Sequence, residues 1–454
     1  MGRGSRRALV LVLSLALIAA VIVGVVIATR SDDRDRGGQN STAPGTSTPF
    51  GGSATTVDSA VPNSTAPDNT VTVNTTDDTS GNTTNATSGN TTGGSTDDSS
   101  GGSDPGTATN DSVSAPEVGT ELRRLVGHTA AVVSAQFGPH NKLLVTAGLD
   151  GIAIIWNVAN GNHITLTGHA GEVYSAVFSP DGSTIATAGA DGTVRVWETK
   201  SGRQLAAFAG HSGAVYQVHY SPDGGSLLSA GADHTVRLWD LISRRQSADF
   251  TGNTGEVYFA GFSPDSQYVV AGGEDGIVRV WSVFAADQPV LLEGHTAPVR
   301  AGGFSPDGTL IATGGDDETT KVWDATTGAL VYDLGYNEGG VASTTFSHDG
   351  ARVMSTGADN TAAIWDIATG DFLGDLHQDG AVPSAAFSPD DNEVVTAGAD
   401  GTAKIWDVSP GTPVGSRIIA TLQVGSPLAG AEFSPEGRVI VTFGEDATPT
   451  LWAS

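Results

Sequence analysis

Cysteine is absent from all 454 residues. Its absence excludes disulfides, thiolate metal ligands, a cysteine nucleophile and a lipidated N-terminal cysteine. Basic residues are few, with 22 Lys and Arg against 50 Asp and Glu, and the formal net charge is −28. This balance argues against nucleic acid as a partner and against recruitment to anionic lipid by a polybasic surface, because both depend on clustered cations.

One long apolar run stands near the start of the chain. Residues 8–29 carry no charge, and a helix of that length crosses a hydrocarbon core of roughly 30 Å. The run exceeds the ~7–15 apolar residues of a cleaved signal peptide, and no clear A-x-A motif follows it, so we predict an uncleaved single-pass transmembrane helix rather than a removed signal. The flanking arginines nearly balance, so the positive-inside rule alone does not orient it. Residues 1–7 are too short for a domain, and we expect the rest of the chain on the extracytoplasmic side.

Residues 30–119 have the composition of a disordered linker. They are rich in Ser, Thr, Asn, Gly and Asp, and Phe50 is their only aromatic residue. Such a segment cannot bury enough apolar surface to offset chain entropy, so we expect a spacer between the membrane and the next domain. Its N-x-[ST] sequons fit either the chance product of this composition or a glycosylated stalk. The sequons begin at Asn40, Asn63, Asn74, Asn82, Asn85, Asn90 and Asn110.

A repeat begins at residue 120 and continues to the end of the chain. The eight tryptophans follow one another at spacings of 41, 42, 42, 42, 42, 41 and 46 residues. An aromatic residue stands nineteen positions before each Trp, and an aspartate stands six positions before it. A period of this length indicates one supersecondary unit per repeat, which buries its apolar face against its neighbours. The tryptophans are Trp156, Trp197, Trp239, Trp281, Trp323, Trp365, Trp406 and Trp452.

Each repeat has the pattern of short strands joined by tight turns. Apolar and small residues alternate or cluster over five to seven positions, as in residues 173–178 and 183–189. Between these two segments lies the turn sequence Ser179-Pro180-Asp181-Gly182, in which Pro presets φ and Gly supplies a positive φ. No helical period of useful length follows residue 120, so the expected fold class is all-β.

These residues resemble the WD40-repeat β-propellers. Gly-His pairs recur at residues 127–128, 168–169, 210–211 and 294–295, and Trp-Asp pairs at 239–240, 323–324, 365–366 and 406–407. The resemblance covers residues 120–454 and implies a single propeller domain. Eight repeats predict eight blades, with seven blades and one irregular unit as the alternative. The chain ends directly after a third strand, so we predict that residues 120–126 supply the outer strand of the last blade and close the ring.

The resemblance also implies a buried hydrogen-bond network of His, Ser or Thr, Asp and Trp within a blade. Because a buried imidazole and a buried carboxylate need partners, this network is expected to be structural. Four repeats carry all members: His128, Thr146, Asp150, Trp156; His169, Thr187, Asp191, Trp197; His211, Ser229, Asp233, Trp239; and His295, Thr313, Asp317, Trp323. A hydroxyl, His and Asp would also fit a hydrolase triad, but four copies at a fixed spacing beside a Trp favour the structural interpretation.

The remaining repeats depart from this pattern. Their His position holds Asn253, Asn337, Gln378 and Val424, and one Ser/Thr position holds Ala271. We expect these blades to be held less tightly. The longest spacing between tryptophans reflects extra residues near 409–416, which we expect in a connection away from the usual binding surface.

By the same resemblance, partner binding uses one rim of the ring. That rim is built by the residues four and six positions before each aromatic and by the residue before the turn aspartate. Tyr and Arg are favoured interface anchors, although ordinary exposed residues at strand edges would have the same pattern. The candidate partner-binding residues are Tyr174, Tyr216, Tyr258, Arg300, Glu172, Glu256, Glu274, Asp316 and Glu445.

The leading hypothesis is a membrane-anchored, non-catalytic scaffold that binds protein or peptide partners. Residues 120–454 hold 16 basic and 38 acidic residues, which favours neutral or basic partners. One alternative is a hydrolase-like enzyme with its site at the mouth of the channel, but the other histidines show no metal-ligand spacing and no GxSxG, P-loop or HExxH motif occurs. The other alternative is a sensor ectodomain that acts through a partner in the membrane. We expect no cofactor and no bound metal.

Overall fold

The structure is a computed structural model that describes residues 116–335 and 337–454. The expected transmembrane helix at residues 8–29 and nearly all of the expected linker lie outside these residues. Within the described part no helix is long and apolar enough to cross a membrane.

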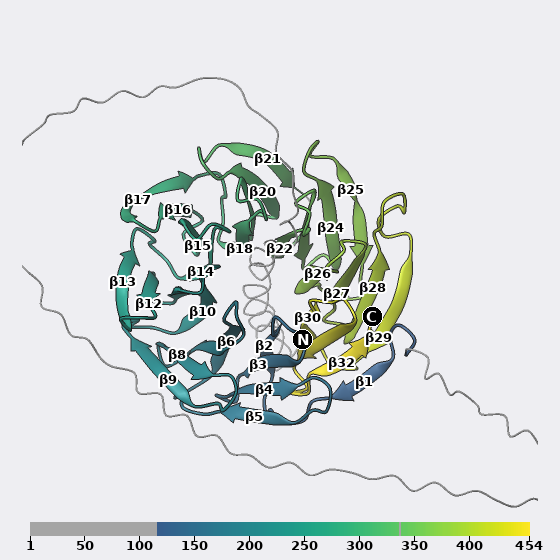
Figure 1. The fold of residues 1–454 in the computed structure, drawn as a ribbon. Coiled ribbons are helices and arrows are strands. Elements are labelled where there is room, and N and C mark those ends of the chain that lie inside the picture. Colours follow the sequence, from purple (N-terminus) through teal and green to yellow (C-terminus); the bar gives the residue numbers. More distant parts are fainter. Residues whose placement is uncertain (1–115, 336) are drawn as a thin grey trace, which may run out of the picture. The chain divides into compact units, whose positions relative to one another are not determined.

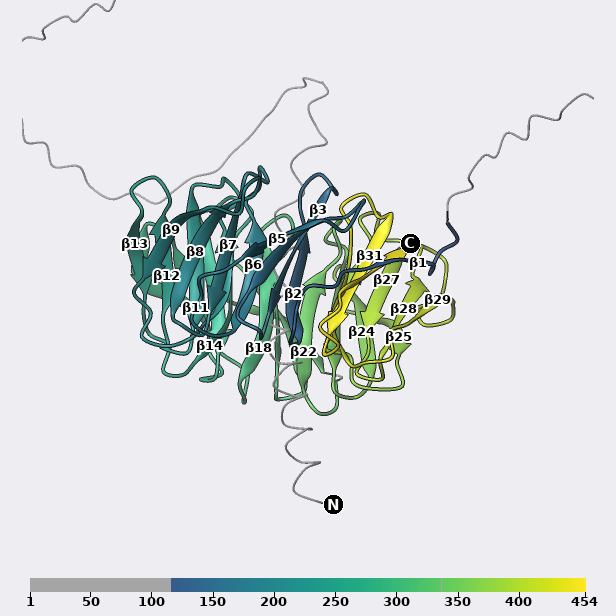
Figure 2. The ribbon, with the colours of Figure 1, turned by 90° about the horizontal axis from the view of Figure 1, so that it is seen from below.

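Eight four-stranded antiparallel sheets form a ring, which confirms the all-β propeller with eight blades and rules out the seven-bladed alternative. Figure 1 shows the ring along its axis, with β2, β6, β10, β14, β18, β22, β26 and β30 innermost. Figure 2 shows the same ring from the side, with the strands running between its two faces. We number the blades in chain order and call the boundary between two neighbouring blades a seam.

The first four blades have the following strands, given from the axis outward. Blade 1 contains β2 (Val132–Phe137), β3 (Leu143–Gly148), β4 (Ala153–Asn157) and β5 (His163–Leu166). Blade 2 contains β6 (Val173–Phe178), β7 (Thr184–Gly189), β8 (Thr193–Glu198) and β9 (Gln204–Ala209). Blade 3 contains β10 (Val215–Tyr220), β11 (Ser226–Gly231), β12 (Val236–Asp240) and β13 (Arg245–Phe250). Blade 4 contains β14 (Val257–Phe262), β15 (Tyr268–Gly273), β16 (Val278–Ser282) and β17 (Ala285–Leu292).

The last four blades repeat this arrangement. Blade 5 contains β18 (Val299–Phe304), β19 (Leu310–Gly315), β20 (Thr319–Asp324) and β21 (Leu330–Gly335). Blade 6 contains β22 (Val341–Phe346), β23 (Arg352–Gly357), β24 (Thr361–Asp366) and β25 (Phe372–His377). Blade 7 contains β26 (Ser384–Phe387), β27 (Glu393–Ala397), β28 (Thr402–Asp407) and β29 (Ile418–Gln423). Blade 8 contains β30 (Leu428–Phe433), β31 (Val439–Gly444), β32 (Thr450–Ala453) and, as its outer strand, β1 (Glu121–Arg124).

The ring is closed by β1, as predicted from the end of the chain. This strand pairs antiparallel with β32, and Arg124 lies opposite Thr450 in the register. The pairing extends beyond the strand, because the amide of Leu125 donates to Pro449 O at 2.8 Å. The Leu125 side chain is 1% exposed and packs in one apolar cluster with Trp156 and Leu451. The closure therefore joins the first and last repeats by backbone bonds and by core packing.

The core consists of eight apolar clusters, one at each seam. The cluster between blades 3 and 4, for example, contains Leu238 from one blade and Val269 and Trp281 from the next. A single four-stranded sheet has no opposing layer of its own, so each blade buries its apolar face only against its neighbours. Burial of such side chains contributes about 25 cal/mol per Å² of apolar surface, which holds the blades in a rigid ring.

Side chains from one blade also accept hydrogen bonds from backbone amides on the inner strand of the next blade. Gln136 Oε1 accepts a hydrogen bond from the amide of Phe178 at 2.7 Å, and Gln217 Oε1 accepts one from Ala260 at 3.0 Å. An inner strand has no fifth strand beside it, so an unpaired amide there would cost free energy. These contacts fix the inner strands, and so the rim side chains that they carry, relative to one another.

The extra residues of blade 7 form the connection between β28 and β29, where the sequence placed them. Val414 of this connection packs against the core cluster that contains Leu376 of blade 6. Gly374 in β25 has a φ of 141°, and a Cβ there would lie 2.9 Å from the side chain of Val414. The connection therefore covers part of the outer strand of the neighbouring blade.

Candidate functional site

The structure joins the four predicted members of each network, which we call a tetrad. In blade 1, His128 Nδ1 lies 3.0 Å from Asp150 Oδ2, and His128 Nε2 lies 2.8 Å from Thr146 Oγ1. Trp156 Nε1 donates to the same Thr146 oxygen at 2.8 Å. The corresponding contacts in blades 2, 3 and 5 are between 2.7 and 2.9 Å.

These contacts determine the direction of the hydrogen bonds. An indole N–H only donates, so Thr146 accepts from Trp156 and gives its own proton to His128 Nε2. His128 then carries its ring proton on Nδ1 and donates it to Asp150. The order hydroxyl, imidazole, carboxylate equals that of a hydrolase triad, but Thr146 is 0% exposed and is covered by Trp156. No substrate reaches this hydroxyl, and the tetrad is a structural element.

Burial sets the protonation of the tetrads. It lowers the pKa of His128, His169, His211 and His295, so these rings are neutral at pH 7. Burial alone would raise the pKa of Asp191, but hydrogen bonds from His169 and Thr193 outweigh it and hold that pKa well below its usual value. The tetrad of blade 2 therefore places a carboxylate beside a neutral imidazole in the interior.

Blade 4 replaces its tetrad with a different network. Arg279 forms an ion pair with Asp275 at 2.9 Å and donates to Asn253 Oδ1 at 3.0 Å. Trp281 Nε1 is buried and has no hydrogen-bond partner among the described residues, because Ala271 supplies no hydroxyl. Arg279 was not among the residues predicted from the sequence. Its position in the repeat could have indicated it, because Arg279 stands two positions before Trp281. A basic residue also stands two positions before Trp197, Trp239, Trp323 and Trp406.

The other incomplete tetrads keep part of the network. In blade 6, Ser355 donates to Asn337 Oδ1 at 2.5 Å. In blade 7, Gln378 Nε2 donates to Thr396 Oγ1 at 2.7 Å, and Trp406 Nε1 donates to the same oxygen at 2.9 Å. In blade 8, beside Val424, the bond from Trp452 Nε1 to Thr442 Oγ1 persists at 2.9 Å.

The predicted rim residues form one continuous row over blades 2 to 5. Tyr174, Tyr216 and Tyr258 are each the second residue of an inner strand. The ring centroids of Tyr174 and Tyr216 are 5.9 Å apart, and those of Tyr216 and Tyr258 are 6.4 Å apart. The guanidinium of Arg300, the second residue of β18, lies 4.7 Å from the centroid of the Tyr258 ring. The first ring pair meets edge-on and the second is tilted, so the three rings and the cation contact one another in succession across three seams.

Acidic residues accompany this row. Tyr216 Oη donates to Glu256 Oε2 at 2.9 Å, across the seam between blades 3 and 4. Glu274 accepts a hydrogen bond from the amide of Glu256 at 3.2 Å. Arg300 forms a two-pronged ion pair with Asp316, with Nε to Oδ1 at 2.8 Å.

Two predicted acidic residues make no such contact. Glu172 is exposed and its carboxylate forms no ion pair or hydrogen bond within the described residues. Glu445 lies in blade 8, away from the row, and is not brought together with it. We define the rim sector as the row with its neighbouring acids: Tyr174, Tyr216, Tyr258, Arg300, Glu172, Glu256, Glu274 and Asp316.

The phenols of the rim sector remain protonated at neutral pH. Burial raises the pKa of Tyr174, Tyr216 and Tyr258, and for Tyr216 the bond to Glu256 raises it further. The sector therefore presents half-buried neutral rings edged by carboxylates. Such a surface offers large contact area with polar tips and suits a neutral or cationic partner.

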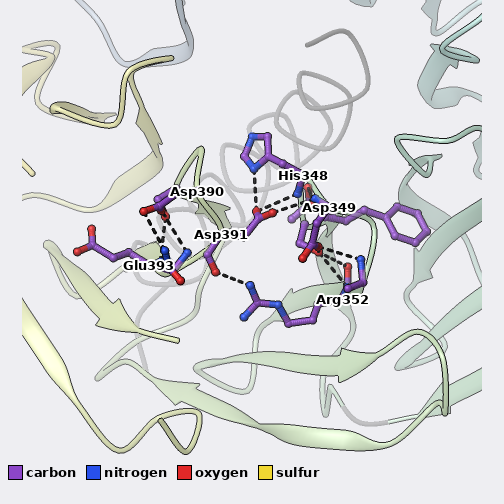
Figure 3. Close-up of polar contacts among 12 residues, drawn as sticks. His348, Asp349, Arg352, Asp390, Asp391 and Glu393 are labelled. Atoms are coloured by element: carbon purple, nitrogen blue, oxygen red, sulfur yellow. Dashed lines mark hydrogen bonds and ion pairs between the residues drawn. The ribbon is translucent and has the colours of Figure 1, made fainter. Parts of the chain in front are cut away.

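A second cluster of charged groups lies in the turns at the seam between blades 6 and 7 (Figure 3). The Asp391 carboxylate accepts from His348 Nδ1 at 2.8 Å and from the amides of His348 and Asp349 at 2.9 Å each. Arg352 donates to Asp391 O and to Val408 O, the latter at 2.9 Å. Each of these bonds joins the two blades or closes a turn, so the cluster stabilises the seam. None of its residues was predicted from the sequence.

No group of three or more His, Asp or Glu suited to a metal ion occurs in residues 116–335 and 337–454. The polar arrangements described above are the tetrads, the blade 4 network of Arg279, the rim sector and the seam cluster. Of these, only the rim sector combines partly exposed aromatic faces with unpaired charge.

The fold, with tetrads at a fixed spacing in blades 1, 2, 3 and 5, defines a repeat β-propeller protein. The model of the family "WD domain, G-beta repeat" matches residues 119–157, 162–198, 202–240, 244–282, 288–324, 328–366 and 372–407, which is more than half of the chain. The chain belongs to the WD40 repeat family. The family model does not match the eighth repeat, which the structure completes as blade 8. WD40 propellers are generally non-catalytic scaffolds that bind proteins or peptides.

A solved structure shares this architecture. The chain is similar to the computationally designed Ika8 protein, known from a crystal structure, with 29% sequence identity and a TM-score of 0.65. The match covers 74% of this chain and 100% of the designed one. A search of curated proteins finds no match.

Proposed function

We propose that this chain is a membrane-anchored, non-catalytic WD40 scaffold that binds a protein or peptide partner through the rim sector. The observation that carries the proposal is the contiguous row of Tyr174, Tyr216, Tyr258 and Arg300. The remaining blades hold short side chains at the equivalent positions, Val133, Ala342, Pro383 and Ala429. Aromatic and arginine anchors are thus concentrated on one half of the ring, which is the distribution expected of an interface rather than of a uniform scaffold.

The charge of the domain indicates the partner's chemistry. With 16 basic against 38 acidic residues in 120–454, the propeller attracts neutral or basic proteins and peptides and repels nucleic acid. The buried tetrads and the apolar clusters at the seams fix the ring, so the partner meets a preformed surface.

The partner is tested by cross-linking capture with the full chain. We expect a protein captured by the wild-type chain to be lost with Tyr216→Ala. Tyr268→Ala is the matched control, because Tyr268 is 47% exposed at the start of β15 and lies outside the rim sector. Equal capture by the wild type and by Tyr216→Ala would contradict the proposal.

Anchoring by residues 8–29, with the propeller on the extracytoplasmic side, is the second part of the proposal. Its support is the uncharged length of that run, which matches the hydrocarbon thickness of a bilayer. Protease treatment of intact cells tests it: loss of the propeller is expected, and full protection until the cells are lysed would reverse the orientation.

A further inference from the structure

At the seam between blades 3 and 4, one side chain contacts both a carboxylate and an aromatic ring of the next blade. Tyr216, the second residue of β10, donates to Glu256, the residue directly before β14. The ring of the same Tyr216 lies in a tilted contact with the ring of Tyr258, the second residue of β14. One side chain from blade 3 thus supplies both a donor for the acid and a neighbouring ring for the tyrosine of blade 4.

The seam between blades 1 and 2 has the acid and the ring of this arrangement, but it lacks the side chain that would contact them from the preceding blade. Glu172 stands directly before β6 and Tyr174 is the second residue of β6, so they correspond to Glu256 and Tyr258. The equivalent of Tyr216 is Val133, which is 0% exposed and carries no donor. Within the described residues, the Glu172 carboxylate and Tyr174 Oη have no hydrogen-bond partner, and the one ring in contact with the Tyr174 ring is that of Tyr216, which meets it edge-on.

The opposite end of the row shows which group completes such a site. There the guanidinium of Arg300 lies over the Tyr258 ring at 4.7 Å while its fork binds Asp316. A planar, delocalised cation fits both an aromatic face and a carboxylate, whereas an ammonium group binds as a point charge. The chain therefore contains its own example of an arginine bound by a tyrosine and an acid.

We propose that Tyr174 and Glu172 form a recognition site for an arginine side chain of the partner. The guanidinium stacks on the Tyr174 ring and pairs with the Glu172 carboxylate, in the place where blade 1 supplies neither group. This inference rests on the proposed function and names the residue of the partner that the rim sector selects. It adds a fifth group to the row at the blade 2 end, as Arg300 ends the row at blade 5.

The site is tested with a fluorescein-labelled, end-blocked pentapeptide of sequence Gly-Ala-Arg-Ala-Gly and the full chain in lipid nanodiscs. Fluorescence anisotropy measures its affinity, and two further peptides replace Arg by Lys or by citrulline, the neutral isostere. We expect Arg to bind about fivefold more tightly than Lys and at least about tenfold more tightly than citrulline. Citrulline binding as tightly as arginine would overturn the proposal, as would no binding of the arginine peptide at millimolar concentration.

Substitutions of Glu172 and Tyr174 test whether the arginine peptide binds at these two residues. Glu172 is exposed, so Glu172→Gln leaves the fold intact, and it should weaken arginine binding about fivefold. Tyr174→Ala should weaken it about tenfold, whereas Tyr174→Phe, which keeps the ring, should stay within about twofold. Glu445→Gln is the control, since Glu445 is a rim acid outside the rim sector. An unchanged affinity in Glu172→Gln would overturn the proposal.

The two proposals fail in different ways. In one outcome, the wild type captures the partner and Tyr216→Ala does not, but the arginine peptide binds no better than the citrulline peptide. The proposed arginine site is then wrong, and the proposed rim interface stands. If the arginine peptide binds as described but no partner depends on Tyr216, the site stands and the proposed interface is wrong.

Discussion

Ala271 stands ten residues before Trp281, at the position where six other blades place the hydroxyl that accepts the indole proton. Trp281 Nε1 is consequently buried without a hydrogen-bond partner among the described residues. A buried donor without a partner costs about 1–3 kcal/mol, so blade 4 carries a defect that one added oxygen can repair.

Ala271→Ser is expected to raise the free energy of unfolding by about 1 kcal/mol, because its hydroxyl restores the missing acceptor. Chemical denaturation followed by fluorescence measures the change. The control is the same substitution in a Trp281→Phe chain, which has no indole donor and should show no gain. A gain of equal size in both chains would show that the hydroxyl does not act through Trp281.

The closure of the ring is tested by two neighbouring residues of different burial. Leu125→Ala is expected to lower the free energy of unfolding by about 2–4 kcal/mol, because Leu125 is 1% exposed in the cluster that joins the first and last blades. Val126→Ala is the matched control: Val126 is 74% exposed and its truncation should change stability by less than about 0.5 kcal/mol. Equal effects of the two changes would contradict the closure by β1.

Stability should fall as the pH is lowered from 8 to 5. Burial lowers the pKa of the four tetrad histidines in the folded state, so the unfolded chain binds protons more readily below its histidine value of about 6.5. Their stabilising contribution is therefore complete above that pH and is lost below it. A second loss follows at lower pH, because the pKa of Asp191 is also depressed in the folded state.

Denaturation curves at pH 8, 6 and 5 measure this dependence. His211→Gln should flatten it, since Gln378 shows that this side chain fits the same position in blade 7. An unchanged slope in His211→Gln would mean that this histidine does not titrate between the folded and unfolded states as described.

The seam cluster between blades 6 and 7 makes a separate prediction. Asp391→Ala removes the acceptor of three hydrogen bonds and places alanine at a φ of 59°, so it should lower the free energy of unfolding by about 2–3 kcal/mol. Asp391→Asn keeps a side chain that tolerates this φ and one acceptor oxygen, and it should cost about half as much. Thermal unfolding of the two variants measures these losses. If Asp391 does not stabilise the seam, neither variant will shift the unfolding midpoint.

The sequence allowed the fold and the tetrads to be predicted because their residues recur at fixed offsets. His128, Thr146, Asp150 and Trp156 are set by one repeat, and the same spacing in three further repeats fixes the same network. The outer strand of blade 8 was predictable for a similar reason, since the last repeat lacks a strand that residues 120–126 supply.

Contacts across seams could not be read in this way. The sequence placed Tyr174, Tyr216 and Tyr258 on one rim, but the contacts between their rings depend on the angle between neighbouring blades. Asp391 was not predicted, because it bonds to His348 and Asp349 of the neighbouring blade and this contact follows from local space and charge rather than from a repeated spacing. Arg279 was also not predicted, although its spacing to Trp281 recurs in four other repeats.

The central claim is that the rim sector is the surface that binds the partner. Its most direct test is titration calorimetry of the captured partner against the wild-type chain, Tyr216→Ala and Tyr268→Ala. The account predicts a loss of at least about tenfold in affinity for Tyr216→Ala, as expected for a tyrosine anchor, and no change for Tyr268→Ala. Wild-type affinity in Tyr216→Ala would contradict it.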